Sequence, residues 1–175
     1  MKTEHSKLSR VGLALGSNLG DRLAHLQTAR ELLKALAVPG EPFLEAPVYQ
    51  TEPLHCPDGS PDFYNMVVEI AFDGTPFDLL DHTQAIERKL GRLVSTERNA
   101  PRVIDVDLLY FGAETIESGP LVVPHPRLTV RRFVLQPLAD IRPELVLPGD
   151  SATIREHLLS LDSPEPPLAL VQANW

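Results

Sequence analysis

The stretch RVIDVDLLYFG, residues 102–112, combines a β-branched and aromatic pattern with two carboxylates. Its apolar residues are typical of a buried strand. An isolated carboxylate buried in such a strand costs roughly several kcal/mol. Because side chains alternate between the faces of a strand, Asp105 and Asp107 share one face about 6.5 to 7 Å apart, and the intervening apolar residues pack on the other. Another group must therefore offset the cost of the two acids.

The chemistry next to this pair favours a cation and a phosphate ligand. Two carboxylates on one face repel each other unless a cation lies between them, and Mg²⁺ prefers oxygen ligands. Arg92, Arg98 and Arg102 precede the pair, and guanidinium groups bind phosphate oxygens in bidentate fashion. Two alternatives remain open: both acids lie on the solvent side of an amphipathic strand, or the arginines neutralise them in a surface network.

The flanking sequence predicts an α+β fold. VGLAL, residues 11–15, indicates a strand that leads into a helix capped by Ser17 or Asn18, and residues 43–51 indicate a strand in which Pro47 marks an edge or a bulge. MVVEIAF predicts another strand, and Thr75 caps a helix that ends at Gly91. This order favours a ferredoxin-like α/β sandwich with a mainly antiparallel sheet and helices packed on it.

Length and composition favour one domain over residues 1–175, with a core of about residues 11–161 and a flexible tail at 162–175. A net charge of -8 argues against nucleic-acid binding. No apolar run approaches the ~20 residues that a membrane span needs. The single Cys56 cannot form an internal disulfide, so a cytoplasmic protein is expected. Neither a P-loop nor a G-x-G-x-x-G motif is present, so a nucleotide must be held differently.

Six motifs in order between about residues 11 and 148 resemble one known family. They are ALGSNLGDR, YQTEPL, PDFYNMVVEI, HTQAIERKLGR, RNAPRVIDVDLLYFG and VPHPRLTVRRFVLQPLADI. Together they are similar to the 6-hydroxymethyl-7,8-dihydropterin pyrophosphokinases (diphosphokinases) of folate biosynthesis. The resemblance implies transfer of the terminal pyrophosphate of ATP to the hydroxymethyl group of the dihydropterin, with release of AMP.

The resemblance also implies roles for particular residues. Asp105 and Asp107 would hold two Mg²⁺ ions, while Arg92, Arg102 and Asp107 would act in catalysis. The ATP site would comprise Gln84, Glu87, Arg92, Arg98, Arg102, Leu108, His125 and Arg131. The pterin site would comprise Gly16, Thr51, Glu52, Pro53, Leu54, Phe63, Asn65, Asp105 and Phe133. Two phenylalanines suit a flat bicyclic ring, and an asparagine offers both a donor and an acceptor to its edge.

Three positions depart from the commonest family pattern: Val94, Asn99 and Pro126. They concern contacts of a loop that closes over the nucleotide, and not the reaction itself. Two other functions are weighed against the resemblance, a D-x-D nucleotide-sugar transferase that uses Mg²⁺ or Mn²⁺ and a non-catalytic ferredoxin-like binding module. A monomer is expected.

Overall fold

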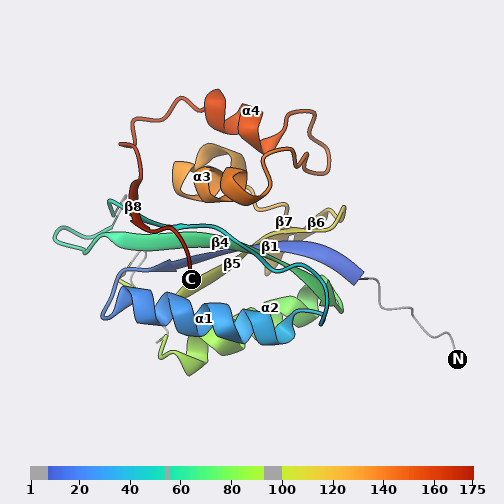
Figure 1. The fold of residues 1–175 in the computed structure, drawn as a ribbon, viewed down its shortest axis with the longest axis horizontal. Helices are drawn as coiled ribbons and strands as arrows, with labels where there is room; N and C mark the ends of the chain where they lie inside the picture. The colour runs from blue at the N-terminus through green and yellow to red at the C-terminus, as the bar shows by residue number, and fades with distance from the viewer. Residues whose placement is uncertain (1–7, 54–55, 93–99) are drawn as a thin grey trace, which may run out of the picture.

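The computed structural model describes residues 8–53, 56–92 and 100–175. Among these residues, one antiparallel sheet of six strands forms the centre of the molecule (Figure 1). The strands run in the order β5-β1-β4-β3-β8, and β2 pairs separately with β4. Their bounds are β1 Leu8–Ser17, β2 Leu44–Glu45, β3 Val48–Thr51, β4 Phe63–Asp73, β5 Asp105–Phe111 and β8 Ala169–Gln172.

Helices cover both faces of this sheet. Figure 1 shows α1 (Arg22–Leu36) and α2 (Pro76–Lys89) on one face and α3 (Arg132–Ile141) and α4 (Ile154–Leu159) on the other. Two buried apolar clusters fill the spaces between the layers. The predicted α+β sandwich with a mainly antiparallel sheet is confirmed. Two small elements precede α3, namely the hairpin β6 (Ile116–Ser118) and β7 (Leu121–Val123) and a 3-10 turn, Leu128–Val130.

The pairing of β1 with both neighbours brings three polar positions side by side. Gly16 lies opposite Asn65 of β4 on one side and opposite Asp105 of β5 on the other. Ala14 lies opposite Asp107 in the same way. The sheet therefore places the aspartate pair and an asparagine beside Ala14 and Gly16, two small residues of β1.

Two sequence predictions in this part of the chain need correction. The α1 helix is capped by Asp21, whose carboxylate accepts from the Ala24 N–H at 3.1 Å, and not by Ser17 or Asn18. The predicted strand at 43–51 is broken into β2 and β3 around Pro47, which has no N–H for a ladder. Of the two alternatives expected at Pro47, β3 is not an edge strand, because β8 pairs with it, whereas the register shift at Val48/Tyr49 agrees with a bulge.

The segment predicted as a flexible tail is ordered. Residues 169–172 form β8, which pairs with β3, and Val171 and Trp175 pack against the core on the α1 side. A proline-rich, polar start hides this strand, because its stability comes from pairing with a distant segment. No helix in the described part of the chain is long and apolar enough to span a membrane.

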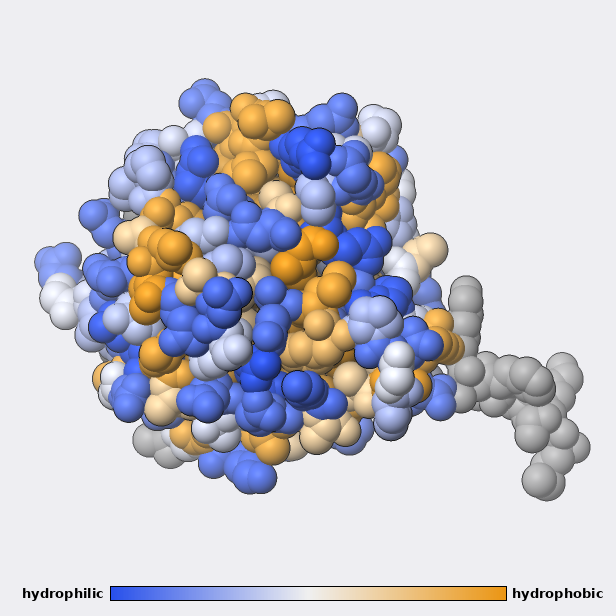
Figure 2. All heavy atoms as spheres, viewed as in Figure 1, coloured by the Kyte–Doolittle hydropathy of each residue, from blue (hydrophilic) through white to orange (hydrophobic). Residues whose placement is uncertain are grey.

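The surface is mixed in character. Figure 2 shows hydrophobic atoms gathered over α4 and over the β8 region, with hydrophilic atoms around them. Leu159 of α4 is 79% exposed and Leu170 of β8 is 60% exposed. Singly exposed apolar residues of this kind are ordinary on soluble domains.

The N-terminus of α2 carries a complete capping box, as the sequence predicts. Thr75 Oγ1 accepts from the Asp78 N–H at 3.1 Å, and Asp78 Oδ2 accepts from the Thr75 N–H at 2.9 Å. We expect Thr75→Ala to lower the free energy of unfolding by about 1 kcal/mol, because a helix donor loses its partner. Urea denaturation followed by circular dichroism measures this change. Thr75→Ser keeps the hydroxyl and is the matched control; an equal loss in both variants would contradict the assignment.

Candidate active site

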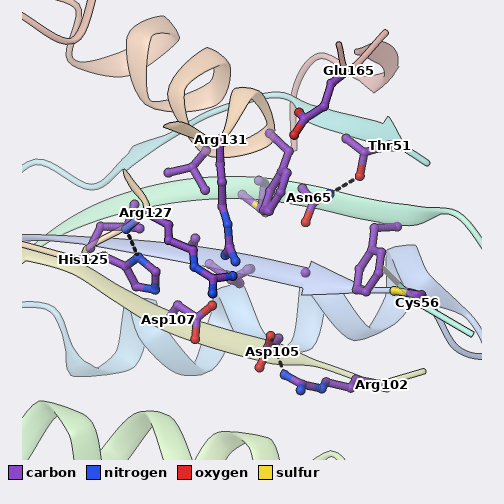
Figure 3. Close-up of a pocket in the computed structure, with 18 of the residues that line it drawn as sticks. Thr51, Cys56, Asn65, Arg102, Asp105, Asp107, His125, Arg127, Arg131 and Glu165 are labelled. Atoms are coloured by element: carbon purple, nitrogen blue, oxygen red, sulfur yellow. Dashed lines mark hydrogen bonds and ion pairs between the residues drawn. The ribbon is translucent and has the colours of Figure 1, made fainter. Parts of the chain in front are cut away.

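A cavity of about 420 Å³ opens above the β5, β1 and β4 strands on the face that α3 covers (Figure 3). Both predicted aromatic residues, Phe63 and Phe133, line it. Asn65 donates through Nδ2 to Thr51 Oγ1 at 2.7 Å, which fixes its amide. A Cβ built on Gly16 would lie 2.8 Å from Asn65 Oδ1, so only glycine leaves room for this side chain. The cavity thus has two flat apolar walls and an oriented amide.

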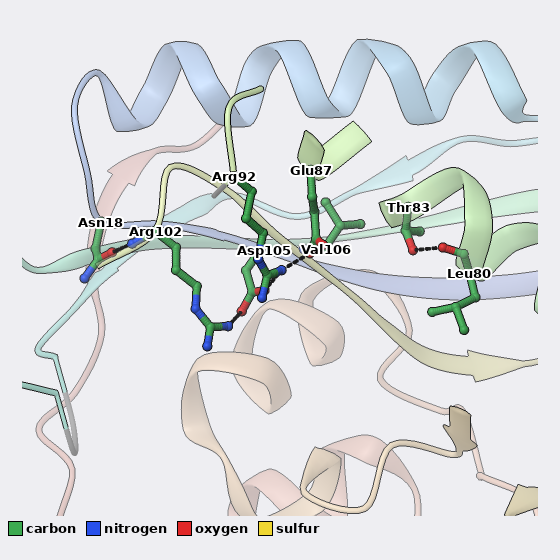
Figure 4. A network of polar contacts seen from close by, with 8 residues as sticks. All are labelled: Asn18, Leu80, Thr83, Glu87, Arg92, Arg102, Asp105 and Val106. Atoms are coloured by element: carbon green, nitrogen blue, oxygen red, sulfur yellow. Dashed lines mark hydrogen bonds and ion pairs between the residues drawn. The ribbon is translucent and has the colours of Figure 1, made fainter. Parts of the chain in front are cut away.

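Arginines hold the first aspartate of the pair. Arg92 Nη1 lies 2.8 Å from Asp105 Oδ1, and Arg102 Nη1 lies 3.0 Å from Asp105 Oδ2 (Figure 4). Arg92 also forms an ion pair with Glu87 of α2, at 2.5 Å. Glu87 accepts in turn from the buried Val106 N–H at 2.9 Å. This network ties α2 to the start of β5.

Asn18 positions Arg102 through the backbone. Its Oδ1 accepts from the Arg102 N–H at 2.7 Å, and its own N–H donates to the Arg102 carbonyl at 3.1 Å. Asn18 is fully buried. The residue expected to cap α1 instead joins the end of β1 to the segment that enters β5, because its short amide reaches this backbone.

Asp107 has no such partner. In the part of the chain that the structure describes, no group forms an ion pair or hydrogen bond with its carboxylate. Burial raises the pKa of Asp107 to about 7, and the negative charges of Asp105 and Glu87 add to this effect against the opposing influence of Arg131 and Arg102. The arginines therefore neutralise Asp105, whereas the charge of Asp107 is not balanced by a direct partner.

Basic residues line the first cavity near the aspartate pair. His125 and Arg131 line it together with Arg127, and all three lie between β7 and α3. Burial, with Arg131 and Arg127 next in importance, lowers the pKa of His125. The Arg127 N–H donates to His125 Nδ1 at 3.1 Å, which leaves the proton of the neutral ring on Nε2. These residues offer cations and one neutral donor to an anionic ligand.

A second, more open hollow lies on the α2 side of the same aspartates. Arg102, Asp105 and Asp107 border both spaces. The remaining lining residues are Leu80, Thr83, Gln84, Glu87, Arg88, Arg92 and Val106. The aspartate pair therefore stands between two spaces, and a ligand that spans them must pass the carboxylates and the arginines.

The donor set fits magnesium. Mg²⁺ is usually held by one or two carboxylates, together with water and substrate phosphates, rather than by a complete protein cage. Asp105 and Asp107 supply such a pair, and no group of three or more acidic, histidine or cysteine ligands occurs among residues 8–53, 56–92 and 100–175. The Asp107 carboxylate has a raised pKa and no partner in the described part of the chain. A bound cation would neutralise its charge.

The structure brings most of the predicted site residues together. The first cavity gathers Gly16, Thr51, Glu52, Phe63, Asn65, Arg102, Asp105, Asp107, His125, Arg131 and Phe133, and the second gathers Gln84, Glu87 and Arg92. Pro53 lines neither space. The Leu108 side chain is 6% exposed and packs in the core, so only its backbone can meet a ligand. Leu54, Val94, Arg98 and Asn99 lie outside the described residues.

Three residues of this region were not predicted from the sequence as site residues, and a fourth was given another role. Arg127 follows a histidine and a proline within a quoted motif, so its charge was a usable signal. Cys56 and Glu165 also line the first cavity, and no local pattern marks either of them. Asn18 was noticed for the wrong role. Taken together, the acidic pair, the arginines and the two adjoining spaces are typical of an enzyme that transfers a phosphate group from a nucleotide.

Comparison with known proteins narrows this class. The family model described as 7,8-dihydro-6-hydroxymethylpterin-pyrophosphokinase (HPPK) matches residues 12–143. The 2-amino-4-hydroxy-6-hydroxymethyldihydropteridine pyrophosphokinase of Bacillus subtilis is 45% identical over 129 residues, which cover 74% of this chain and 75% of that protein. Its counterpart from Pseudomonas aeruginosa is 41% identical over 143 residues, or 81% and 85% of the two chains. The chain belongs to the HPPK family.

Solved structures agree on the fold. Wild-type Plasmodium falciparum HPPK-DHPS with pteroate superimposes with a TM-score of 0.72 at 17% identity. The match covers 90% of this chain and 45% of that longer one. The ferredoxin-like fold expected from the sequence is confirmed.

The raised pKa of Asp107 predicts how stability depends on pH. Between about pH 4 and 7 the folded protein binds more protons than the unfolded chain, so stability falls as pH rises through this window. In metal-free buffer with EDTA, we expect Asp107→Asn to be more stable than the parent at pH 8 by at most about 4 kcal/mol. The gain should vanish near pH 4. Urea unfolding at several pH values measures it, and a gain independent of pH would contradict the assigned cause.

Proposed function

We propose that this chain transfers the terminal pyrophosphate of ATP to the hydroxymethyl group of 6-hydroxymethyl-7,8-dihydropterin, giving AMP and the dihydropterin diphosphate in folate biosynthesis. Membership of the HPPK family supports this reaction. The observation that carries it is the aspartate pair, bordered by arginines, between the two spaces. No observation favours the nucleotide-sugar transferase or the non-catalytic binding module.

The first cavity is the proposed pterin site. Phe63 and Phe133 line it and offer flat apolar surfaces to a bicyclic ring. The Asn65 amide, held by Thr51, presents polar atoms to the edge of that ring. A ring bound here places its hydroxymethyl group toward Asp105 and Asp107, which border the same cavity.

The second space is the proposed nucleotide site. Gln84 offers amide donors and acceptors to a base, and Glu87 offers an acceptor. The Arg92 and Arg102 guanidinium groups, about a third exposed and already directed at Asp105, have the geometry to bind phosphate oxygens. Arg131 on the other wall extends the positive field across the first cavity, and His125 adds a neutral donor.

Asp105 and Asp107 are the proposed ligands of two Mg²⁺ ions. When bound, these ions would neutralise charge on the phosphate oxygens as it develops. The protein itself supplies alignment: the sheet register fixes the two carboxylates, and Glu87 and Asn18 fix the arginine-bearing segments. Such positioning and charge stabilisation supply most of the catalysis in phosphoryl transfer.

The transfer is a single displacement in this proposal. The hydroxymethyl oxygen bonds to the β-phosphorus of ATP while the bond from that phosphorus to the α,β-bridging oxygen breaks, and AMP leaves with that oxygen. In this proposal Asp107 also accepts the hydroxyl proton, since its carboxylate borders the cavity in which the hydroxymethyl group would lie. Arg92 and Arg102 stabilise the negative charge on the transferred group.

The proposed enzyme works as a monomer in the cytoplasm. The single Cys56, which lines the first cavity, is compatible with a reducing compartment.

Incubation with ATP, Mg²⁺ and 6-hydroxymethyl-7,8-dihydropterin tests the reaction directly. We expect AMP and the dihydropterin diphosphate in equal amounts, as measured by chromatography. ADP, or no product from folded protein, would contradict the proposal. EDTA should abolish AMP formation and excess Mg²⁺ should restore it.

Substitutions show whether Asp105 and Asp107 act in the reaction or are ordinary surface charges. Asp105→Asn and Asp107→Asn should each lower kcat by at least about 100-fold, because phosphate charge is no longer neutralised. Asp73→Asn, at the exposed end of β4, removes the same charge far from the pair and should leave kcat within twofold of the parent. Near-normal turnover of either site variant at saturating Mg²⁺ would refute the metal assignment.

A further inference from the structure

One wall of the first cavity comes from beyond the segment that the family model matches. The model ends at residue 143, whereas Glu165 lines both this cavity and a smaller adjoining hollow of about 250 Å³. Figure 3 shows the Glu165 carboxylate directed from the C-terminal segment toward the cavity, on the side of Thr51 and Asn65. We call residues 163–175 the C-terminal arm.

The arm is fixed to the rest of the protein at two points, and one further contact lies within the arm. Its β8 strand pairs with β3, the strand that ends in Thr51. Beyond β8, Trp175 packs against the core, and the Arg30 guanidinium lies 5.3 Å from the centre of its indole ring. Before β8, the Glu165 N–H donates to Ser163 Oγ at 3.2 Å. The carboxylate is therefore presented from an ordered backbone.

The Glu165 carboxylate has acceptor capacity to spare. Within residues 8–53, 56–92 and 100–175, no group donates a hydrogen bond to it or pairs with it as an ion, although its negative charge acts on Arg131. The side chain is half-buried. A partly desolvated carboxylate gains most from a donor that a ligand brings.

The position of Glu165 indicates which part of a ligand it would contact. A carboxylate repels phosphate, and Figure 3 shows Glu165 across the cavity from Asp107, where the phosphates would pass. Its neighbours in both hollows are Thr51, Glu52 and Phe133, which belong to the proposed pterin side. The dihydropterin ring carries an amino group and ring N–H groups, all of them donors.

We propose that Glu165 is a specificity-determining residue that accepts a hydrogen bond from an N–H group of the bound dihydropterin, and that the C-terminal arm completes the pterin site. This inference rests on the proposed function. It adds to that function a residue and a segment that lie outside the matched family region.

Equilibrium binding tests the inference without turnover. Isothermal titration of the dihydropterin into protein loaded with Mg²⁺ and a non-hydrolysable ATP analogue gives the pterin Kd. We expect Glu165→Ala to raise this Kd about tenfold, since hydrogen bonds to charged groups are the stronger ones. Glu165→Gln keeps an acceptor oxygen and should give a smaller increase. The Kd of the ATP analogue alone should stay within twofold.

Asp162→Asn is the matched control. It removes one carboxylate just before the arm from an exposed position that lines none of the three spaces. It should leave both dissociation constants within twofold. Thermal unfolding of every variant shows whether the fold is retained.

A double-mutant cycle tests the arm itself. Trp175→Ala removes the packing on Arg30 and should raise the pterin Kd by loosening the arm. The same change in the Glu165→Ala background should have little further effect, because the carboxylate that the arm presents is already gone. Equal effects in both backgrounds would refute the positioning role of the arm.

The outcomes separate this inference from the proposed function. If the parent protein forms AMP and Glu165→Ala binds the dihydropterin as tightly as the parent, the function stands and the inference fails. If Glu165→Ala weakens the ATP analogue as much as the pterin, Glu165 acts through Arg131 on the nucleotide and the inference also fails. If the parent forms no AMP, the proposed function fails first.

Discussion

The site depends on the ion pairs that Arg92 and Arg102 form with Asp105. Three carboxylates, Glu87, Asp105 and Asp107, approach one another where α2 meets β5, and Arg92 and Arg102 neutralise only the first two directly. The pKa of Asp107 rises because burial and its acidic neighbours outweigh the arginines. A site left in this state is poised for an added cation, and the same arginines can turn to phosphate once a cation holds the acids.

Backbone geometry, rather than side-chain flexibility, sets this arrangement. The register of β1 against β4 and β5 places Asn65, Gly16 and Asp105 in one row across three strands. Glu87 reaches the β5 backbone at the Val106 N–H, and Asn18 holds the backbone of Arg102. These contacts join one helix and two strands that are distant in sequence. Precise placement of charge is what a reaction governed by positioning requires.

The sequence correctly predicted those elements whose formation depends on neighbouring residues in the chain. The apolar alternation around Asp105 and Asp107 indicated β5 and the shared face of the acids, and Thr75 with Asp78 indicated the start of α2. Long-range pairing was not visible. The β8 strand is stabilised by β3 some 120 residues earlier in the chain, so its proline-rich approach was taken for a flexible tail. Asn18 was assigned to a helix cap because its true partner, the Arg102 backbone, lies 84 residues further along the chain.

The two sides of the site are carried by different parts of the sheet. The charged side depends on β5, α2 and the second half of β1, which lie within the matched family segment, whereas the C-terminal arm adds β8 to the far side through β3. An added strand extends a sheet by backbone hydrogen bonds and leaves the existing register in place. The wall around Thr51 and Glu165 can therefore vary without moving Asp105 or Asp107. In the proposed function this wall serves ligand selection and the β5 side serves phosphate chemistry, so the two roles lie on separable parts of the sheet.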